Sequence, residues 1–311
     1  MKTKVWLALF AVYLVWGSTY LAIRFAVATL PPFLMTGTRI LIAGSILYIF
    51  LRVSGAAPRP TKTQWRAAGI VGLFLLVGGN GLVGWAEQRV VSSVAALIIA
   101  AVPLWIVLID AIRPGGSKPS FQIVLGVLIG FAGVLVLIDP LNYGKSESRV
   151  DLIGAAVLLV STIFWATGSI YGREHHHEMP AHPLMTAGMQ MLAGGVGLLI
   201  LATFSGEWSR LDLASVTRES WLAWGYLIVF GSIVAFASYS WLLGHAPTPL
   251  VATYAYVNPL VAVLLGSLLA GEPVSPQFVF AAALIIGAVV LITTVRWVQA
   301  NSRLRAVEKQ S

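Results

Sequence analysis

The chain has 311 residues, of which 58% are hydrophobic and 10% are charged, whereas an average soluble domain has about 25% charged residues. With a mean hydropathy of +0.86, this composition excludes an ordinary soluble protein and predicts an integral membrane protein. The absence of cysteine excludes disulfides, thiolate metal sites and cysteine nucleophiles. The net charge of +8 favours basic cytoplasmic loops over nucleic-acid binding, because no polar segment is long enough for a nucleic-acid-binding module.

Apolar runs long enough to cross about 30 Å of hydrocarbon follow one another along the chain. The first run has a basic start, as a signal peptide has, but it is too long for one and no convincing cleavage site precedes its end. The predicted spans cover approximately residues 4–24, 33–52, 66–87, 91–112, 119–138, 152–172, 183–204, 220–243, 250–270 and 277–297. We therefore expect an all-α integral membrane protein with ten transmembrane helices.

The ten spans form two related groups of five. The letters LMTGTRILIAG (34–44) return as LMTAGMQMLAG (184–194), and with a shift of 156 Trp85 falls on Trp241 and Pro103 on Pro259. An odd number of spans in each repeat forces the second copy to enter the membrane from the opposite side, which gives inverted repeats. We predict one repeat in residues 1–140, a second in 150–298 and a cytoplasmic tail in 299–311. Chance matching between apolar segments is the alternative.

The basic residues predict the orientation of the spans. With the N-terminus in the cytoplasm, thirteen Lys and Arg residues lie inside, six lie outside and Arg39 lies within a span. Basic residues accumulate in cytoplasmic loops. Both termini are therefore expected in the cytoplasm.

Inverted repeats favour transport, because two pseudo-symmetric halves can rock about a central site and expose it to each side in turn. A channel would need charged rings or a filter sequence, and none is visible. The sequence also has no HExxH, GxSxG or buried carboxylate pair, so we do not expect an enzyme, and we expect no cofactor and no metal.

Two further segments, VVSSVAALIIAAVPLWIVLID and LAGEPVSPQFVFAAALIIGAVVLI, resemble the fourth-to-fifth and ninth-to-tenth helix regions of the EamA family of the drug/metabolite transporter superfamily. The resemblance extends from about residue 6 to residue 297. It implies a ten-helix bundle in the bacterial inner membrane, alternating access and the export of amino acids or other small metabolites. The chain departs from the internal symmetry at one place, because Gly271-Glu272-Pro273 has its counterpart in Arg113-Pro114-Gly115-Gly116.

Arg39 and Glu87 are the charged candidates for function. A charge within the hydrocarbon is costly and is usually kept only beside a partner or a wet cavity, so Arg39 is either a substrate or coupling contact, half of a structural ion pair, or a side chain that reaches the interface. Glu87 is its expected partner and a candidate proton carrier. An interfacial position beside Arg89 is the alternative for Glu87. Asp110 and Glu272 are expected to be loop or capping groups.

Polar residues beside glycine and proline mark a possible cavity. Asn80 lies in GGNGLVG, where it can line a cavity or join helices; the GxGxxG letters there lack the strand and acidic residue of a dinucleotide site. Asn258 and Pro259 are expected to break the ninth span, with Tyr254 one turn earlier, and Pro103 is expected to repeat the break in the fourth. A kink needed only for packing is the alternative.

Trp16 and Trp165 occupy equivalent places in the first helix of each repeat. Aromatic rings at this depth can enclose a flat or amphipathic substrate, and core packing or interface anchoring is the alternative. The run His175-His176-His177 invites a metal reading, but it lies in a short loop without a structured cage, which favours a soluble, pH-responsive loop without a metal.

The sequence as a whole predicts an inner-membrane exporter of small organic metabolites, amino acids or related compounds, that works by alternating access. The residues expected to bind the substrate are Trp16, Arg39, Asn80, Trp165, Tyr254 and Asn258. Its expected partners are the substrate and the lipid bilayer, and it is expected to be a monomer or a homodimer that binds no nucleic acid. One alternative is a proton-coupled exporter of lipophilic cations that uses Glu87. Another is a channel or a membrane scaffold without transport.

Overall fold

The computed structural model describes residues 2–116, 118–139, 150–246, 248–251 and 253–308, and all regular structure within them is helical. Lys145, Arg149 and Lys309, which entered the orientation count, lie outside these residues. Nine helices of the described part are long and apolar enough to cross a membrane, and α14 (Tyr254–Ala270) is a shorter apolar helix. Together they make the ten expected spans, which confirms the predicted fold class.

The spans are built from helices that are often interrupted. The first five are α1 (Lys2–Val27), α2 (Pro32–Val53), α3–η1–α4 (Lys62–Gly72, Leu73–Gly81, Leu82–Ala86), α5–α6 (Ser92–Ile99, Val102–Ile112) and α7 (Phe121–Ile138). The second five are α8 (Leu152–Glu174), α9 (Pro183–Phe204), α11–η4–α12 (Arg218–Tyr226, Leu227–Val234, Ala235–His245), α13–α14 (Thr248–Val251, Tyr254–Ala270) and α15 (Pro276–Glu308). Two short helices, η3 (His176–Glu178) and α10 (Glu207–Arg210), lie in connections. Because α15 continues to Glu308, the predicted tail is largely an extension of the last helix.

Local sequence signals start several of these helices. Thr61 caps α3 in a capping box with Gln64, in which each residue's side chain accepts the other's backbone N–H. Asp151 accepts the N–H of Gly154 at 2.6 Å at the start of α8, and Thr217 does the same for Ser220 at the start of α11. Such caps satisfy N–H groups that the first helical turn leaves without a partner.

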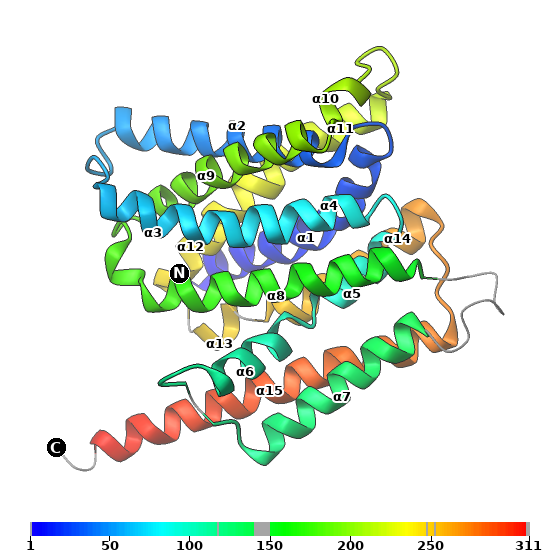
Figure 1. Ribbon diagram of the computed structural model, residues 1–311. Helices are drawn as coiled ribbons and strands as arrows, with labels where there is room; N and C mark the ends of the chain where they lie inside the picture. The colour runs from blue at the N-terminus through cyan, green and yellow to red at the C-terminus, as the bar shows by residue number, and fades with distance from the viewer. Residues whose placement is uncertain (1, 117, 140–149, 247, 252, 309–311) are drawn as a thin grey trace.

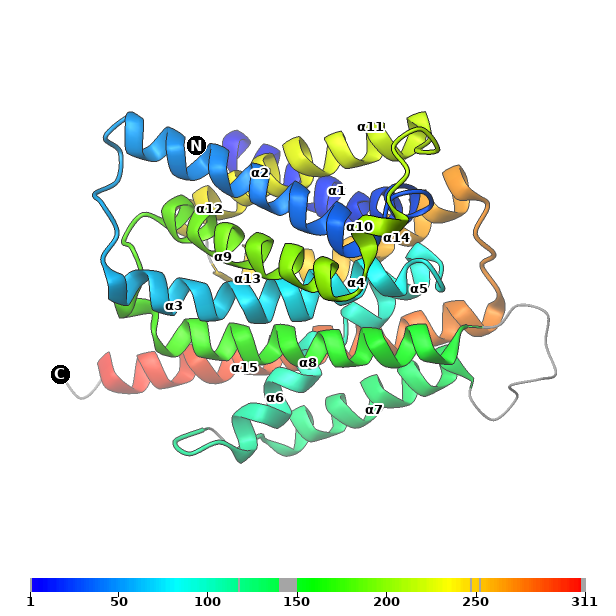
Figure 2. The same ribbon diagram turned by 45° about the horizontal axis from the view of Figure 1, so that its top comes forward.

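The two repeats pack against each other helix by helix (Figures 1 and 2). The α2–α9 pair lies at one edge of the bundle and the α7–α15 pair at the opposite edge, while α1 packs on α14 between them. Glycine allows this close approach, since a Cβ added at Gly44 would lie 2.7 Å from the Cβ of Met191. A Cβ added at Gly133 would likewise lie 2.8 Å from the Cβ of Leu284. Small residues are the usual contact between membrane helices.

The helices of the two repeats are interrupted in corresponding spans. The third and eighth spans both contain a π-helical segment, η1 and η4. The fourth span breaks between α5 and α6, directly before Pro103, as expected. Pro259, in contrast, lies inside α14, and the helix continues through it. The break expected at Pro259 is therefore in the wrong place, because the ninth span is interrupted several residues earlier, between α13 and α14. The helix continues through Pro259 because α14 packs on α1 and α5, which supports it on both sides of the proline.

Different elements meet at the two ends of the bundle. The "terminal end" is the end where α1 begins and α15 ends, as an even number of spans requires (Figure 1). The "Glu272 end" is the opposite one, where α1 ends and α5 begins. At the Glu272 end α5 packs against α1, α8 and α14, so elements of both repeats meet there.

Candidate functional site

Arg39 and Asn80 meet inside the bundle. Arg39 lies on α2 and is only 5% exposed, and its Nη2 donates a hydrogen bond of 3.3 Å to Oδ1 of Asn80 on η1. The Nε of Arg39 is buried and has no hydrogen-bond partner in the described part of the chain. The guanidinium is thus held by a neutral amide, which leaves hydrogen-bonding capacity unused.

Trp165 lies against Gly79, the residue before Asn80, where the missing side chain gives it room. A Cβ added at Gly79 would lie 2.7 Å from Cε3 of the Trp165 ring, so α8 and η1 approach closely at this point. One turn earlier on α8, the hydroxyl of Ser161 donates to the carbonyl oxygen of Gly79 at 3.2 Å. The structure therefore brings three of the predicted residues, Arg39, Asn80 and Trp165, into one neighbourhood.

Trp16, the counterpart of Trp165 in the first repeat, lies at the centre of an aromatic cluster. Its ring centroid is 5.2 Å from those of Tyr239 and Tyr254 and 5.4 Å from that of Phe236. Its indole N–H donates to the carbonyl oxygen of Gly231 on η4 at 3.3 Å. Edge-to-face contacts of this kind hold aromatic rings in fixed positions.

Asn258 lies one turn after Tyr254 and ties α14 to α1. With its amide nitrogen directed at them, it donates to the carbonyl oxygens of Tyr254 and Tyr13 at 3.2 and 3.3 Å. A Cβ added at Gly17 would lie 3.1 Å from the carbonyl oxygen of Asn258. In this conformation the Asn258 amide joins two helices, and its side chain is buried.

The two tryptophans have equivalent surroundings. Trp16 contacts Gly231 in η4, and Trp165 contacts Gly79 in η1. Both glycines lie within π-helical segments, where backbone hydrogen bonds are altered and which are frequent at functional sites. Inverted symmetry thus produces two half-sites, each made of a tryptophan on a π-helical glycine.

Glu87 does not form the expected ion pair with Arg39. Among the described residues no ion pair joins the two, and both carboxylate oxygens of Glu87 are buried without a hydrogen-bond partner. Glu87 directly follows the last residue of α4 and is 3% exposed, so it is buried in the protein at the end of its span. Burial, reinforced by the carboxylate of Glu272 and opposed by the guanidinium groups of Arg24 and Arg39, raises the pKa of Glu87 well above its ordinary value of 4.5.

Glu272 has the partners that Glu87 lacks, and it is the cap expected from the sequence. It forms an ion pair with Arg24 at the end of α1, and it accepts the backbone N–H groups of Ser92 and Ser93, each at 2.9 Å, and the Ser92 hydroxyl at 2.7 Å. Burial by itself would raise the pKa of Glu272, but these hydrogen bonds outweigh it and the pKa lies below 4.5. Arg24 and Glu272 are 248 residues apart, which is why spacing along the sequence could not reveal the pair.

This pKa predicts how the stability contributed by Glu272 depends on pH. Because the folded state favours the ionised form, the stabilisation is present above the ordinary pKa and is lost as the pH falls through the lowered folded value. We expect the difference in Tm between the wild type and Glu272→Gln to stay constant from about pH 8 to about pH 5.5 and to shrink below about pH 4.5. A difference that already shrinks near pH 6 would contradict this assignment.

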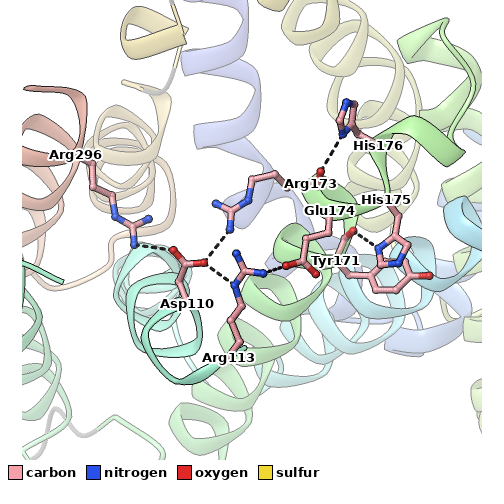
Figure 3. A network of polar contacts seen from close by, with 8 residues as sticks. All are labelled: Asp110, Arg113, Tyr171, Arg173, Glu174, His175, His176 and Arg296. Carbon is pink, nitrogen blue, oxygen red and sulfur yellow. Dashed lines mark hydrogen bonds and ion pairs between the residues drawn. The ribbon is translucent and has the colours of Figure 1, made fainter. Parts of the chain in front are cut away.

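Asp110 connects three spans at the terminal end (Figure 3). It is 5% exposed, and its Oδ1 accepts from Nε of Arg113 at 2.7 Å and from Nη2 of Arg173 at 3.0 Å. Nη2 of Arg296 lies 3.9 Å from Oδ2, and Glu174 pairs with Arg113. The expectation of a loop or capping group was therefore incomplete, because Asp110 lies within α6 and collects arginines from α8 and α15.

The histidines lie next to this network. The ring of His175 stacks on that of Tyr171 with centroids 4.0 Å apart, and Nδ1 of His176 is 3.1 Å from the carbonyl oxygen of Arg173 (Figure 3). Within the described residues there is no group of three or more side chains placed to hold a metal ion.

A groove of about 770 Å³ opens at the terminal end between α1 and α12. Its lining includes Lys4, Ala8, Ser238 and Trp241. Trp241 and Ala8 pack against the same buried apolar cluster as Trp16 and Tyr254. The groove therefore lies beside residues that pack on the same cluster as Trp16.

Comparisons with known proteins cover nearly the whole chain. The model of the EamA-like transporter family matches residues 3–139 and 152–294. The chain is 41% identical over 287 residues to the uncharacterized inner membrane transporter YedA of Escherichia coli K12, which covers 92% of this chain and 89% of YedA.

More distantly similar proteins also match over nearly the whole chain. The chain is 24% identical to the uncharacterized transporter YvbV of Bacillus subtilis, over 94% of this chain and 92% of YvbV. A solved crystal structure with 23% identity superposes with a TM-score of 0.62 and covers 94% of this chain and 97% of its own. That structure shares the fold.

Proposed function

Because the chain belongs to the EamA-like transporter family and is a multi-pass inner-membrane transporter, we propose that it exports small organic metabolites, amino acids or related compounds, by alternating access. The substrate binds between the two half-sites, with Arg39, Asn80 and Trp165 on one side and Trp16, Tyr254 and Asn258 on the other. The rocking of inverted repeats exposes this position to one side of the membrane at a time.

The observation that carries the substrate class is the state of Arg39. Its guanidinium is buried, bonded to a neutral amide and not paired with a carboxylate among the described residues. A buried charge is costly unless it is paired. A carboxylate on the substrate supplies that pairing, with Asn80 as a second polar contact. One arginine suits a single carboxylate better than a sugar phosphate, which demands several basic groups.

The aromatic half-sites fit the rest of an amino acid. Trp16 with Tyr239 and Tyr254 presents ring edges and faces held in place by each other. Such surfaces accept aliphatic and aromatic side chains and, through their π-faces, an ammonium group.

The proposed orientation has both termini in the cytoplasm, as the distribution of basic residues favours. The Asp110 network, with Arg113, Arg173 and Arg296, then lies at the cytoplasmic side. The Glu272 end faces the periplasm.

A second candidate function rests on Glu87. A buried carboxylate with neither oxygen hydrogen-bonded can bind a proton or a cation, which suits proton-coupled export of lipophilic cations. Pro103 is the second residue of α6, after the α5–α6 break, and Pro259 lies inside the first half of α14. Both remain proposed cavity-lining positions in either function.

Counterflow in proteoliposomes separates these functions. Vesicles are preloaded with unlabelled amino acids, and uptake of labelled phenylalanine and leucine is compared with uptake of phenethylamine, which is phenylalanine without its carboxylate. We expect saturable exchange of the amino acids and none of the amine, with or without a pH gradient.

Other outcomes identify the alternatives. Uptake of phenethylamine or a lipophilic cation that follows the pH gradient, with no amino-acid exchange, would replace the proposal by proton-coupled drug export. Unsaturable leakage without counterflow would indicate a channel.

A further inference from the structure

Four corners of the fold are built in the same way. The glycines with left-handed backbone conformation in the described residues are Gly55, Gly115, Gly206 and Gly271, with φ values of 68°, 73°, 69° and 63°. They follow the second, fourth, seventh and ninth spans, and inverted symmetry pairs Gly55 with Gly206 and Gly115 with Gly271. Left-handed glycine is a common way to end a helix, so the four corners have matching backbones.

The residue after the glycine differs between the repeats. In the second repeat it is glutamate at both corners, Glu207 and Glu272. In the first repeat it is Ala56 after Gly55 and Gly116 after Gly115. Two carboxylates are thus present at one end of the molecule, and their symmetry counterparts have no hydrogen-bonding side chain.

Both glutamates bind the start of a helix in the other repeat. Glu207 is 1% exposed and accepts the backbone N–H groups of Phe33 and Leu34 in the first turn of α2, at 3.2 and 2.8 Å. Glu272 is 4% exposed and binds Ser92 and Ser93 in the first turn of α5. A carboxylate at a helix N-terminus satisfies free N–H groups and interacts favourably with the helix dipole.

The residues that donate hydrogen bonds to Glu272 also differ from their counterparts in the second repeat. The shift of 156 that relates Gly115 to Gly271 also relates the first residues of α5 and α13, Ser92 and Thr248. It places Pro249 opposite Ser93, and proline has no backbone N–H to donate. The counterpart of the Glu272 contact therefore lacks both its acceptor and one of its donors.

We propose that the Gly206-Glu207 and Gly271-Glu272 corners form a lock that holds the Glu272 end closed, so that the resting transporter opens preferentially at the terminal end. Each contact joins the two repeats, and rocking that opens the Glu272 end has to break it. Arg24 on α1 strengthens the second contact through its ion pair with Glu272. The inference rests on the proposed function only in assuming alternating access, and it holds for any substrate.

The ion pairs at the terminal end do not offset this bias. The Asp110 network consists of α6, the connection after it, α8 and α15, and its arginine side chains are 25 to 53% exposed. Solvent weakens pairs of that kind. Asp110 is a buried carboxylate as well, but its donors are these partly exposed side chains. The donors to Glu207 and Glu272 include backbone N–H groups fixed at the start of a helix, which make charge-assisted hydrogen bonds.

The test uses the natural absence of cysteine. Ala95→Cys places a reporter on α5 near the Glu272 end, where Ala95 is 0% exposed, and Ser238→Cys places one in the groove at the terminal end. A membrane-impermeant maleimide is applied to right-side-out and to inverted vesicles without substrate. With the lock intact, we expect slow labelling of the Ala95→Cys reporter and fast labelling of the Ser238→Cys reporter.

In the double variant Glu207→Gln and Glu272→Gln, labelling of the Ala95→Cys reporter is expected to rise about tenfold, because two charge-assisted caps are weakened. Labelling of the Ser238→Cys reporter should fall or stay the same. Glu219→Gln is the matched control, since Glu219 is an exposed carboxylate in the first turn of α11 at the same end. In the Glu219→Gln variant, both cysteine reporters should be labelled at the same rates as in the protein with the lock intact.

Two results would overturn the lock. One is unchanged labelling of the Ala95→Cys reporter in the double variant, and the other is an equal rise at both ends, which would indicate general loosening. If the double variant does not fold, Glu272→Asp serves instead, because a shorter carboxylate keeps the charge but cannot reach both serines. Labelling requires no substrate, so a failed counterflow experiment and a failed lock remain distinguishable.

Discussion

Replacing Arg39 with glutamine is expected to raise the KM for amino-acid exchange about 30- to 150-fold, while the protein remains folded. The estimate follows from the loss of a hydrogen-bonded charge pair with the substrate carboxylate, worth about 2 to 3 kcal/mol. The fold is expected to survive because the guanidinium makes a single 3.3 Å bond to Asn80 and has an unused Nε. Glutamine retains a donor for Asn80, so the helices stay connected.

Counterflow of labelled phenylalanine measures this effect, with Arg52→Gln as the control. Arg52 lies on the same helix and donates to the carbonyl oxygen of Ala57 at 3.0 Å, and its loss should leave the KM unchanged. Arg39→Lys tests the geometry, because a lysine keeps the charge but cannot bind a carboxylate through two parallel hydrogen bonds.

The same experiment decides between the three roles that the sequence leaves open for Arg39. An unchanged KM with a lowered Tm would identify a structural residue, and an unchanged KM and Tm would identify a side chain that only reaches the interface. The 5% exposure of Arg39 and its bond to Asn80 already argue against the last of these.

Replacing Asp110 with asparagine is expected to lower the stability of the protein by about 2 to 4 kcal/mol. Asp110 is buried and is the shared acceptor for Arg113, Arg173 and Arg296. Its neutralisation leaves three guanidinium groups close together, with the carboxylate of Glu174 beside Arg113. Breaking a fully buried ion pair can cost up to about 5 kcal/mol. We expect a smaller loss here, because the arginine side chains are partly exposed to solvent.

Thermal unfolding of the purified protein, followed by tryptophan fluorescence, measures this loss. Arg66→Gln is the control, since Arg66 is 70% exposed in its pair with Glu178 and an exposed pair contributes about 0 to 1 kcal/mol. If the Tm of Asp110→Asn matched that of Arg66→Gln, the Asp110 network would not stabilise the terminal end.

Much of the fold could be predicted from the sequence, because span length and hydropathy are local properties. Each predicted span lies close to a helix of the structure, including the interrupted fourth span before Pro103. The ninth span was predicted with its break in the wrong place, since proline excludes a hydrogen bond but the packing of α14 on α1 and α5 decides whether the helix continues.

The candidate site was predicted as separate residues. Charge and polarity within apolar runs singled out Arg39 and Asn80, and equivalent positions singled out Trp16 and Trp165. The partners could not be predicted in the same way. Tyr239 and Phe236, which surround Trp16, are ordinary aromatic residues in a helix that contains many. Arg39 bonds to Asn80 instead of Glu87, and Glu87 has no hydrogen-bond partner among the described residues.

The sequence by itself thus determined the ten membrane spans, the two inverted repeats and the few polar groups kept inside the membrane, because each depends on what a short segment can tolerate in hydrocarbon. Only the tertiary structure decided that Arg24 pairs with Glu272 and that Glu207 caps α2. These contacts join residues more than 170 positions apart. A hydrogen bond across the repeats depends on distances of a few tenths of an ångström, which are set by the packing of the whole bundle and by no single segment.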